Sequence, residues 1–167
     1  MGVNPLPAKT ILESVKELTS LHEGLHAIAL QKTEMIKKGD LDRLQSILKE
    51  ENLYIKQIRQ TEGKLVQETQ LFLEKSGAST ESPSLSKVID LVEDKTAFMT
   101  EKTKLETQIE ALRQQNLLNQ DLLEQSLQFV QMNLELLQPD IDSFNYNRPE
   151  VNQESPHPKR SIFDSNA

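Results

Sequence analysis

The feature that most constrains this chain is a long stretch without a helix breaker. From about Lys95 to Gln138 the sequence contains neither glycine nor proline. A single helix over that stretch is roughly 65 Å long at about 1.5 Å per residue. Pro139 ends it, because proline cannot continue a helix. A helix of this length favours an elongated bundle over a sheet-based domain.

The composition agrees with a helical fold. Charged residues make up 27% of the chain and aromatic residues 4%, and there are five glycines and no tryptophan. Leu, Glu, Gln and Lys are abundant, and no run of β-branched residues alternates with a period of two. The predicted class is all-α. The absence of cysteine excludes disulfides and thiolate metal sites.

Local signals place the helix ends. Gly39 follows two lysines and stops a first helix, and Asp40 can cap a second helix that runs until Gly77. The tight KKGD junction makes these two an antiparallel helical hairpin. The predicted helices cover about 8–38, 41–76, 84–93 and 95–138, with a bend near Asp94 left open. Residues 1–138 then form an elongated bundle domain, in which the long third helix joins the hairpin. Residues 139–167, rich in Pro, Asn and Ser, form a flexible, disordered tail.

Apolar stripes at steps of three and four predict the buried faces of the hairpin. In the first helix the stripe consists of Ile11, Val15, Leu18, His22, Leu25, Ala29 and Ile36. In the second helix it consists of Leu41, Leu44, Leu48, Glu51, Ile55, Ile58, Glu62 and Leu65.

The pentapeptide HEGLH, from His22 to His26, matches the zinc-protease signature H-E-x-x-H. With Glu51 opposite in the hairpin, a His, His, Glu ligand set is geometrically conceivable. Such enzymes need a sheet and an open cleft, however, and the sequence predicts neither. We therefore expect a structural polar layer, in which His22 or His26 bonds Glu51, with no metal and no catalytic residue. A zinc metalloprotease stays a remote alternative.

The long C-terminal helix carries two apolar stripes. One continues from Leu105, Ile109 and Leu112 through Asn116 and Asn119 to Leu123, Leu127, Val130, Leu134 and Leu137. The other consists of Leu118, Leu122, Phe129, Met132 and Leu136. A helix in a three-helix bundle needs only one buried stripe. The second stripe faces another bundle helix in a larger core, a second copy of the chain, or a partner's amphipathic helix.

Charge and hydropathy exclude several classes of partner and environment. A formal net charge of −7 argues against nucleic acid. No segment approaches about eighteen uncharged apolar residues, so no membrane insertion is expected. The N-terminus MGVNPLPAK lacks the pattern of a secretion signal, which predicts a cytoplasmic protein. No cofactor is implied, and the chain is not expected to be an enzyme.

Two long stretches resemble the FlgN family of flagellar export chaperones, in its Gram-positive form. They are KKGDLDRLQSILKEENLYIKQIRQTE and NLLNQDLLEQSLQFVQMNLELL, and the FNYN and KRSIFDSNA segments of the tail are similar to tails in that family. The likeness covers nearly the whole chain and departs from the family pattern at Gly63-Lys64.

The resemblance implies a helical chaperone. It would bind hook-filament junction (hook-associated) proteins in the cytoplasm and deliver them to the flagellar type III export apparatus. The match carries the family's cargo-binding segment onto Leu117–Leu137, and hence onto the second stripe. A tail residue would dock at the export gate, with Tyr146 and its neighbour Phe144 as candidates. A homodimer and a structural coiled-coil adaptor without an export role remain open alternatives.

Overall fold

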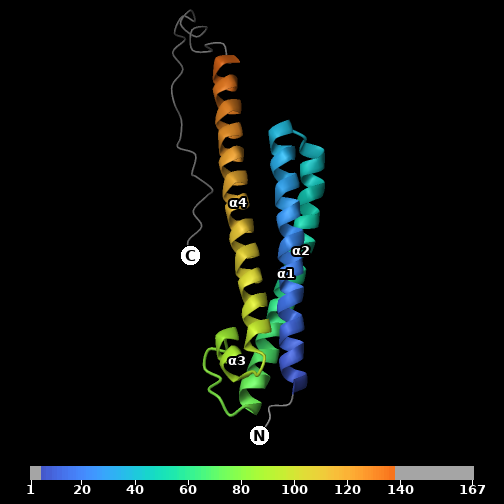
Figure 1. The fold of residues 1–167 in the computed structure, drawn as a ribbon. Helices are drawn as coiled ribbons and strands as arrows, with labels where there is room; N and C mark the ends of the chain where they lie inside the picture. Colours follow the sequence, from blue (N-terminus) through green and yellow to red (C-terminus); the bar gives the residue numbers. More distant parts are fainter. Residues whose placement is uncertain (1–4, 138–167) are drawn as a thin grey trace, which may run out of the picture. The chain divides into compact units, whose positions relative to one another are not determined.

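The computed structural model describes residues 5–137 and contains four helices in that range. They are α1 (Pro5–Lys38), α2 (Leu41–Lys75), α3 (Leu85–Leu91) and α4 (Lys95–Leu137) (Figure 1). No strand occurs among these residues, and the all-α prediction is confirmed. Residues 1–129 form one compact unit and residues 130–167 a second. The described part of the second unit consists of the last turns of α4, residues 130–137. The predicted domain boundary between residues 138 and 139 stays a prediction.

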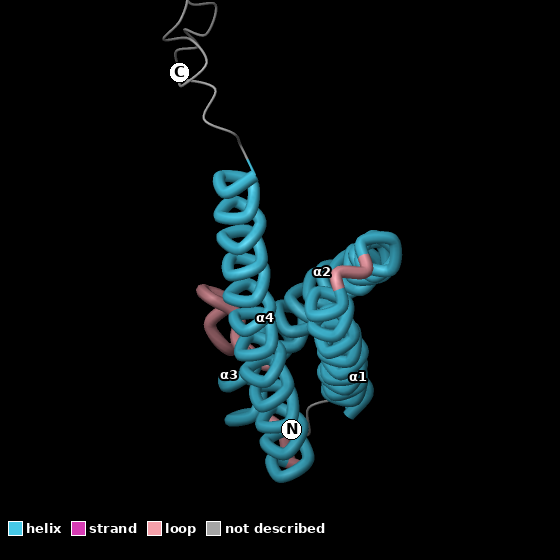
Figure 2. The backbone as a smooth tube through the Cα atoms, turned by 90° about the horizontal axis from the view of Figure 1, so that it is seen from above, coloured by secondary structure: helices cyan, strands magenta, loops and turns pink. Residues whose placement is uncertain are grey.

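α1 and α2 form the predicted antiparallel hairpin, joined by a short loop that is pink in Figure 2. Gly39 adopts a φ of 66°, a left-handed conformation that glycine reaches without steric cost. That conformation lets the N–H of Asp40 donate to the carbonyl of Met35 at 3.1 Å, closing the end of α1. Asp40 then caps α2, because its carboxylate accepts from the N–H of Arg43 at 3.1 Å.

A first core cluster lies at the end of the hairpin where α1 begins and α2 ends (Figure 1). There α3 packs Val88 and Ile89 against Phe72 and Leu73 of α2. The predicted helix 84–93 is shorter than expected and ends at Leu91. Val92 has an extended backbone, and the Asp94 carboxylate accepts from the N–H of Ala97. The helix is therefore interrupted at these residues, and α4 starts as a separate helix at Lys95.

A second core cluster joins all three long helices. It consists of Leu18, Leu25 and Ala29 of α1, Ile58 of α2 and Leu112 of α4. Every member of the stripe predicted for α1, from Ile11 to Ile36, is buried. The prediction for α1 is therefore confirmed.

The stripe predicted for α2 is confirmed only in part. Leu41 and Leu48 are exposed, as is Glu62. Ile58 of the predicted stripe is buried, and the other buried residues of α2 lie outside the stripe. They are Ile47, Thr61, Thr69, Phe72 and Leu73. Apolar residues occupy neighbouring positions in α2, as at Ile47 and Leu48, so its sequence supports two adjacent stripes. The position of α1 decides which of the two is covered.

Candidate functional site

The HEGLH segment lies in the middle of α1. His22 is buried, with 9% of its surface exposed, and its Nδ1 lies 2.8 Å from the carbonyl oxygen of Leu18, one turn earlier. Its ring faces α4 rather than α2, because it lines a groove of about 380 Å³ together with Leu112 and Asn116 of α4. His26 is half-buried.

Glu51 has a partner other than the predicted histidine. Its carboxylate accepts from the ammonium group of Lys32 at 2.5 Å, between side chains that are both mostly covered. Among the described residues, no hydrogen bond joins His22 or His26 to Glu51. The predicted polar layer is thus replaced by an α1–α2 ion pair and a separate contact of His22 within its own helix. In residues 5–137, no three His, Cys, Asp or Glu side chains form a group that could hold a metal ion.

Gly24, inside the same segment, supports the packing of α2. A methyl group placed on Gly24 would lie 2.3 Å from Cε1 of Tyr54 and 2.8 Å from its Cζ. The aromatic ring of α2 therefore rests directly on the backbone of α1. A glycine in the middle of a helix, which is unfavourable by itself, is explained here by a close helix–helix contact.

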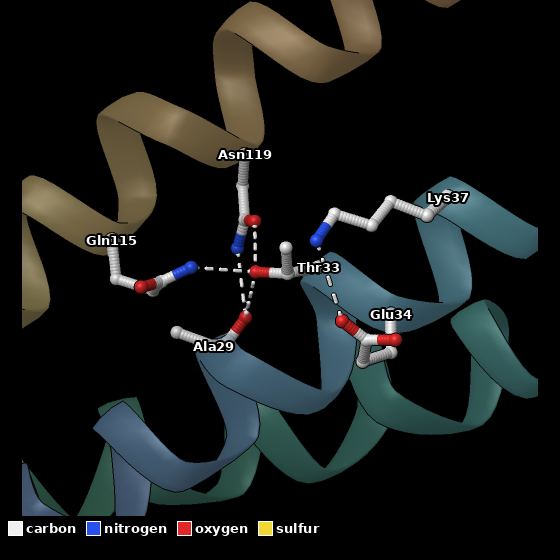
Figure 3. Close-up of polar contacts among 6 residues, drawn as sticks. All are labelled: Ala29, Thr33, Glu34, Lys37, Gln115 and Asn119. Carbon is white, nitrogen blue, oxygen red and sulfur yellow. Dashed lines mark hydrogen bonds and ion pairs between the residues drawn. The ribbon is translucent and has the colours of Figure 1, made fainter.

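A buried cluster of uncharged polar groups holds α4 against α1 (Figure 3). The Asn119 side chain, 3% exposed, donates through Nδ2 to the carbonyl of Ala29 at 2.9 Å. Its Oδ1 lies 2.5 Å from the hydroxyl of Thr33, which also accepts from Nε2 of Gln115 at 2.6 Å. The hydroxyl has one proton, which serves either Asn119 or the carbonyl of Ala29, 3.0 Å away.

This cluster separates two parts of α4. Before it, Phe98, Leu105 and Leu112 recur every seven residues and are buried or half-buried, and Asn119 continues the series. After it, the residues predicted to continue this stripe are all exposed. They are Leu123, Leu127, Val130, Leu134 and Leu137. The expectation that the first stripe is buried over its whole length is therefore wrong.

The length of α1 explains the change within the first unit. Asn119 contacts Ala29 and Thr33, and α1 ends at Lys38, little more than one turn further on. The turns of α4 that follow Asn119 thus have little of α1 left to pack against.

The predicted cargo-binding residues begin at Leu118, directly before Asn119, and continue to Leu136 near the end of α4. Leu118 and Phe129 of the first unit are 46% and 64% exposed, and Met132 and Leu136 of the second are 57% and 77% exposed. Leu122 is half-buried. Tyr146 and Phe144, the candidates for docking at the export gate, lie outside the described residues.

Sequence reasoning missed the groove beside His22. Besides the residues already named, Ile109, Arg113, Leu117 and Gln120 of α4 line it. The signal was present in the sequence, because Leu117 and Arg113 lie one turn apart and follow Ile109 on one side of α4. Which side of α1 they would meet could be read only from the packed helices.

Comparison with known proteins identifies relatives. The model of the family described as "FlgN protein" matches residues 3–154. The chain is 32% identical over 169 residues to the "Uncharacterized protein YvyG" of Bacillus subtilis (strain 168), covering 97% of this chain and 100% of that protein. No solved structure matches the chain. Within the described residues, no helix is long and apolar enough to cross a membrane.

Proposed function

Because the chain belongs to the FlgN family of flagellar export chaperones, we propose that it binds hook-filament junction (hook-associated) proteins in the cytoplasm. It then delivers them to the flagellar type III export apparatus. The observation that carries the proposal is the series of exposed apolar side chains in α4 from Leu118 onward.

The cargo-binding residues of the proposal are Leu118, Leu122, Phe129, Met132 and Leu136. Burying half-exposed side chains of this size against a partner contributes about 1 kcal/mol each, at roughly 25 cal/mol per Å² of apolar area. An amphipathic terminal helix of the cargo is the natural ligand for such residues, because it presents its own apolar stripe at the same spacing. Met132 adapts to different cargo side chains, because its unbranched side chain is flexible.

Docking at the export gate is assigned to the tail, residues 139–167. Tyr146, with Phe144 beside it, is the proposed contact, since an aromatic side chain supplies a large area that fits a pocket. The support for this assignment is the resemblance of the FNYN segment to tails of the family.

The proposal is tested with the purified terminal segment of a hook-associated protein from the same bacterium. Leu118→Asp and Met132→Asp each place a charge on the proposed face and should weaken binding about tenfold or more, because an unpaired charge resists burial. Leu71→Asp, at an exposed leucine of α2, is the matched control and should bind as the native chain does. Titration calorimetry measures the affinity, and circular dichroism checks that helix content is kept. Unchanged binding by both α4 variants would contradict the assignment of cargo binding to these residues.

A self-associating coiled coil without an export role is the second candidate, because the same exposed leucines could pair two copies of α4. It predicts that Leu118→Asp and Met132→Asp abolish a dimer seen by sedimentation equilibrium and that the hook-associated segment does not bind. A chaperone that works as a homodimer would instead show both properties: it would form a dimer and would also bind the hook-associated segment.

A further inference from the structure

Three exposed cations of α2 have no carboxylate within ion-pair distance. They are Lys49, Lys56 and Arg59, and none of them takes part in an ion pair of the described residues. Steps of seven and three place them on one side of the helix. The positions three and four residues from Lys49 and Lys56 hold no Asp or Glu. Only Arg59 has an acidic neighbour at such a position, Glu62.

Several cations elsewhere in the helices are neutralised locally. Lys9, Lys64 and Lys102 each lie within 4.0 Å of a glutamate one turn later. Other cations without an ion pair among the described residues, such as Lys16, Lys75 and Lys95, lie far apart along the chain. In a chain with a net charge of −7, the three cations of α2 are notable because they share one helix side. The isolated positive charge is available to a ligand of opposite sign.

Apolar and amide groups lie beside these cations. Leu48 is exposed and Ile55 is half-buried. Ile55, Lys56 and Arg59 line a shallow hollow of about 410 Å³ together with Asn52 and Gln60. This side of α2, hereafter the basic face, thus combines cations, amide donors and apolar carbon.

We infer that the basic face of α2 is a second protein-docking surface, whose partner is an acidic amphipathic helix. The charges select Asp or Glu on the partner, and Leu48, Ile55 and the hollow accept its apolar side chains. Nucleic acid fits less well, because phosphate binding gains nothing from exposed leucine and uses many more cations. The surface lies on another helix than the proposed cargo site, so the inference does not depend on the proposed function.

The test uses the full chain and a synthetic probe. The probe is a fluorescein-labelled helical peptide of about 18 residues, long enough to form a helix when bound, with Leu at steps of three and four and Glu on either side. A second peptide with Lys in place of every Glu controls for charge, and a scrambled peptide of the first composition controls for amphipathicity. Fluorescence anisotropy gives the affinity at several salt concentrations.

Two variants of equal charge separate the basic face from the net charge. In the first, Lys49→Gln, Lys56→Gln and Arg59→Gln are combined. In the second, Lys9→Gln, Lys64→Gln and Lys102→Gln are combined at locally paired cations. We expect the acidic peptide to bind about tenfold more weakly to the first variant only. Three exposed ion pairs together contribute about this factor to the affinity, and the first variant lacks them. Leu48→Ser should also weaken binding, whereas Leu71→Ser should not. All the side chains changed here except Lys102 are exposed, and circular dichroism verifies the fold.

Other results would overturn the inference. Equal binding of the acidic, basic and scrambled peptides, or equal loss in the two triple variants, would mean that the basic face selects no partner. Tighter peptide binding after deletion of residues 139–167 would identify the chain's own tail as the occupant. A dimer that dissociates only in the first variant would identify a second copy. Binding to vesicles of anionic lipid without binding to the acidic peptide would identify a membrane surface.

Discussion

At the scale of single residues, Gly24 shows how a motif can be misread. Within HEGLH it looks like the variable position of a zinc-protease signature. In the structure its missing side chain leaves room for the ring of Tyr54. His22 in the same segment bonds the carbonyl of Leu18 and faces α4. Two residues of the pentapeptide are thus explained by helix packing, Gly24 by its contact with α2 and His22 by its position beside α4.

Gly24 supports a prediction in which one substitution changes sign with its background. In the native chain, Gly24→Ala should lower the free energy of unfolding by about 1 kcal/mol, because the new methyl group pushes the Tyr54 ring out of its packed position. In the Tyr54→Ala background the obstacle is gone. There the same change should raise stability by about 1 kcal/mol, since alanine is the better helix former. Urea denaturation of the four proteins measures both effects. Stabilisation by Gly24→Ala in both backgrounds would contradict the packing assigned to Tyr54.

At the scale of elements, the docking of α4 depends on a polar contact inside a mainly apolar interface. Asn119 lies where the sequence continues an apolar stripe, and its side chain bonds Ala29 and Thr33 of α1. An apolar stripe by itself tolerates a shift of one helix along the other. A buried amide does not, because a shifted helix would leave its donors and acceptors unpaired. The cluster thus sets the register of α4 on α1.

The register contact predicts a contrast between two asparagines of α4. Asn119→Ala should destabilise the chain by about 1–3 kcal/mol, because the Thr33 hydroxyl and the Ala29 carbonyl lose bonds in a buried setting. Asn116→Ala, at an exposed position three residues earlier, should change stability by less than about 0.5 kcal/mol. Thermal and urea unfolding measure the difference. The Thr33→Val, Asn119→Ala double-mutant cycle should give a coupling of about 1 kcal/mol, and no coupling would mean that the cluster is energetically irrelevant.

At the scale of the whole molecule, the buried core and part of the proposed cargo-binding surface lie in different units of the chain. Every buried residue of the described range precedes Leu122, and both core clusters lie within residues 1–129. The proposed cargo-binding residues include Met132 and Leu136 of the second unit. The fold therefore needs little from residues 130–137, which carry two of the proposed contacts.

Deletion of residues 130–167 tests this separation. The shortened chain should keep its helical hairpin. Its free energy of unfolding should lie within about 1 kcal/mol of that of the full chain, because the deletion removes no buried side chain of the described range. Its affinity for the hook-associated segment should fall about tenfold or more, because two of the proposed contacts are removed. Urea denaturation and calorimetry report the two properties separately. Loss of cooperative unfolding would show that the second unit contributes to the core.

The sequence by itself determined what depends on neighbouring residues. Gly39, Asp40 and the start of α4 at Lys95 were predicted correctly, because a helix end is decided by caps and backbone preferences within a few residues. The buried stripe of α1 was also predictable, since that helix has one continuous apolar side. The family could be recognised from the pattern of the whole chain.

Only the tertiary structure decided which of several sequence-compatible surfaces is covered. α2 has two adjacent apolar stripes, and the contact of Tyr54 with Gly24 selects one of them. His22 could face either neighbouring helix, and α4 lies on its side of α1. The first stripe of α4 continues in the sequence beyond Asn119, yet the residues that continue it are exposed. Burial is a property of two packed surfaces, so periodicity in one helix shows what can be buried, while the position of its neighbour settles what is.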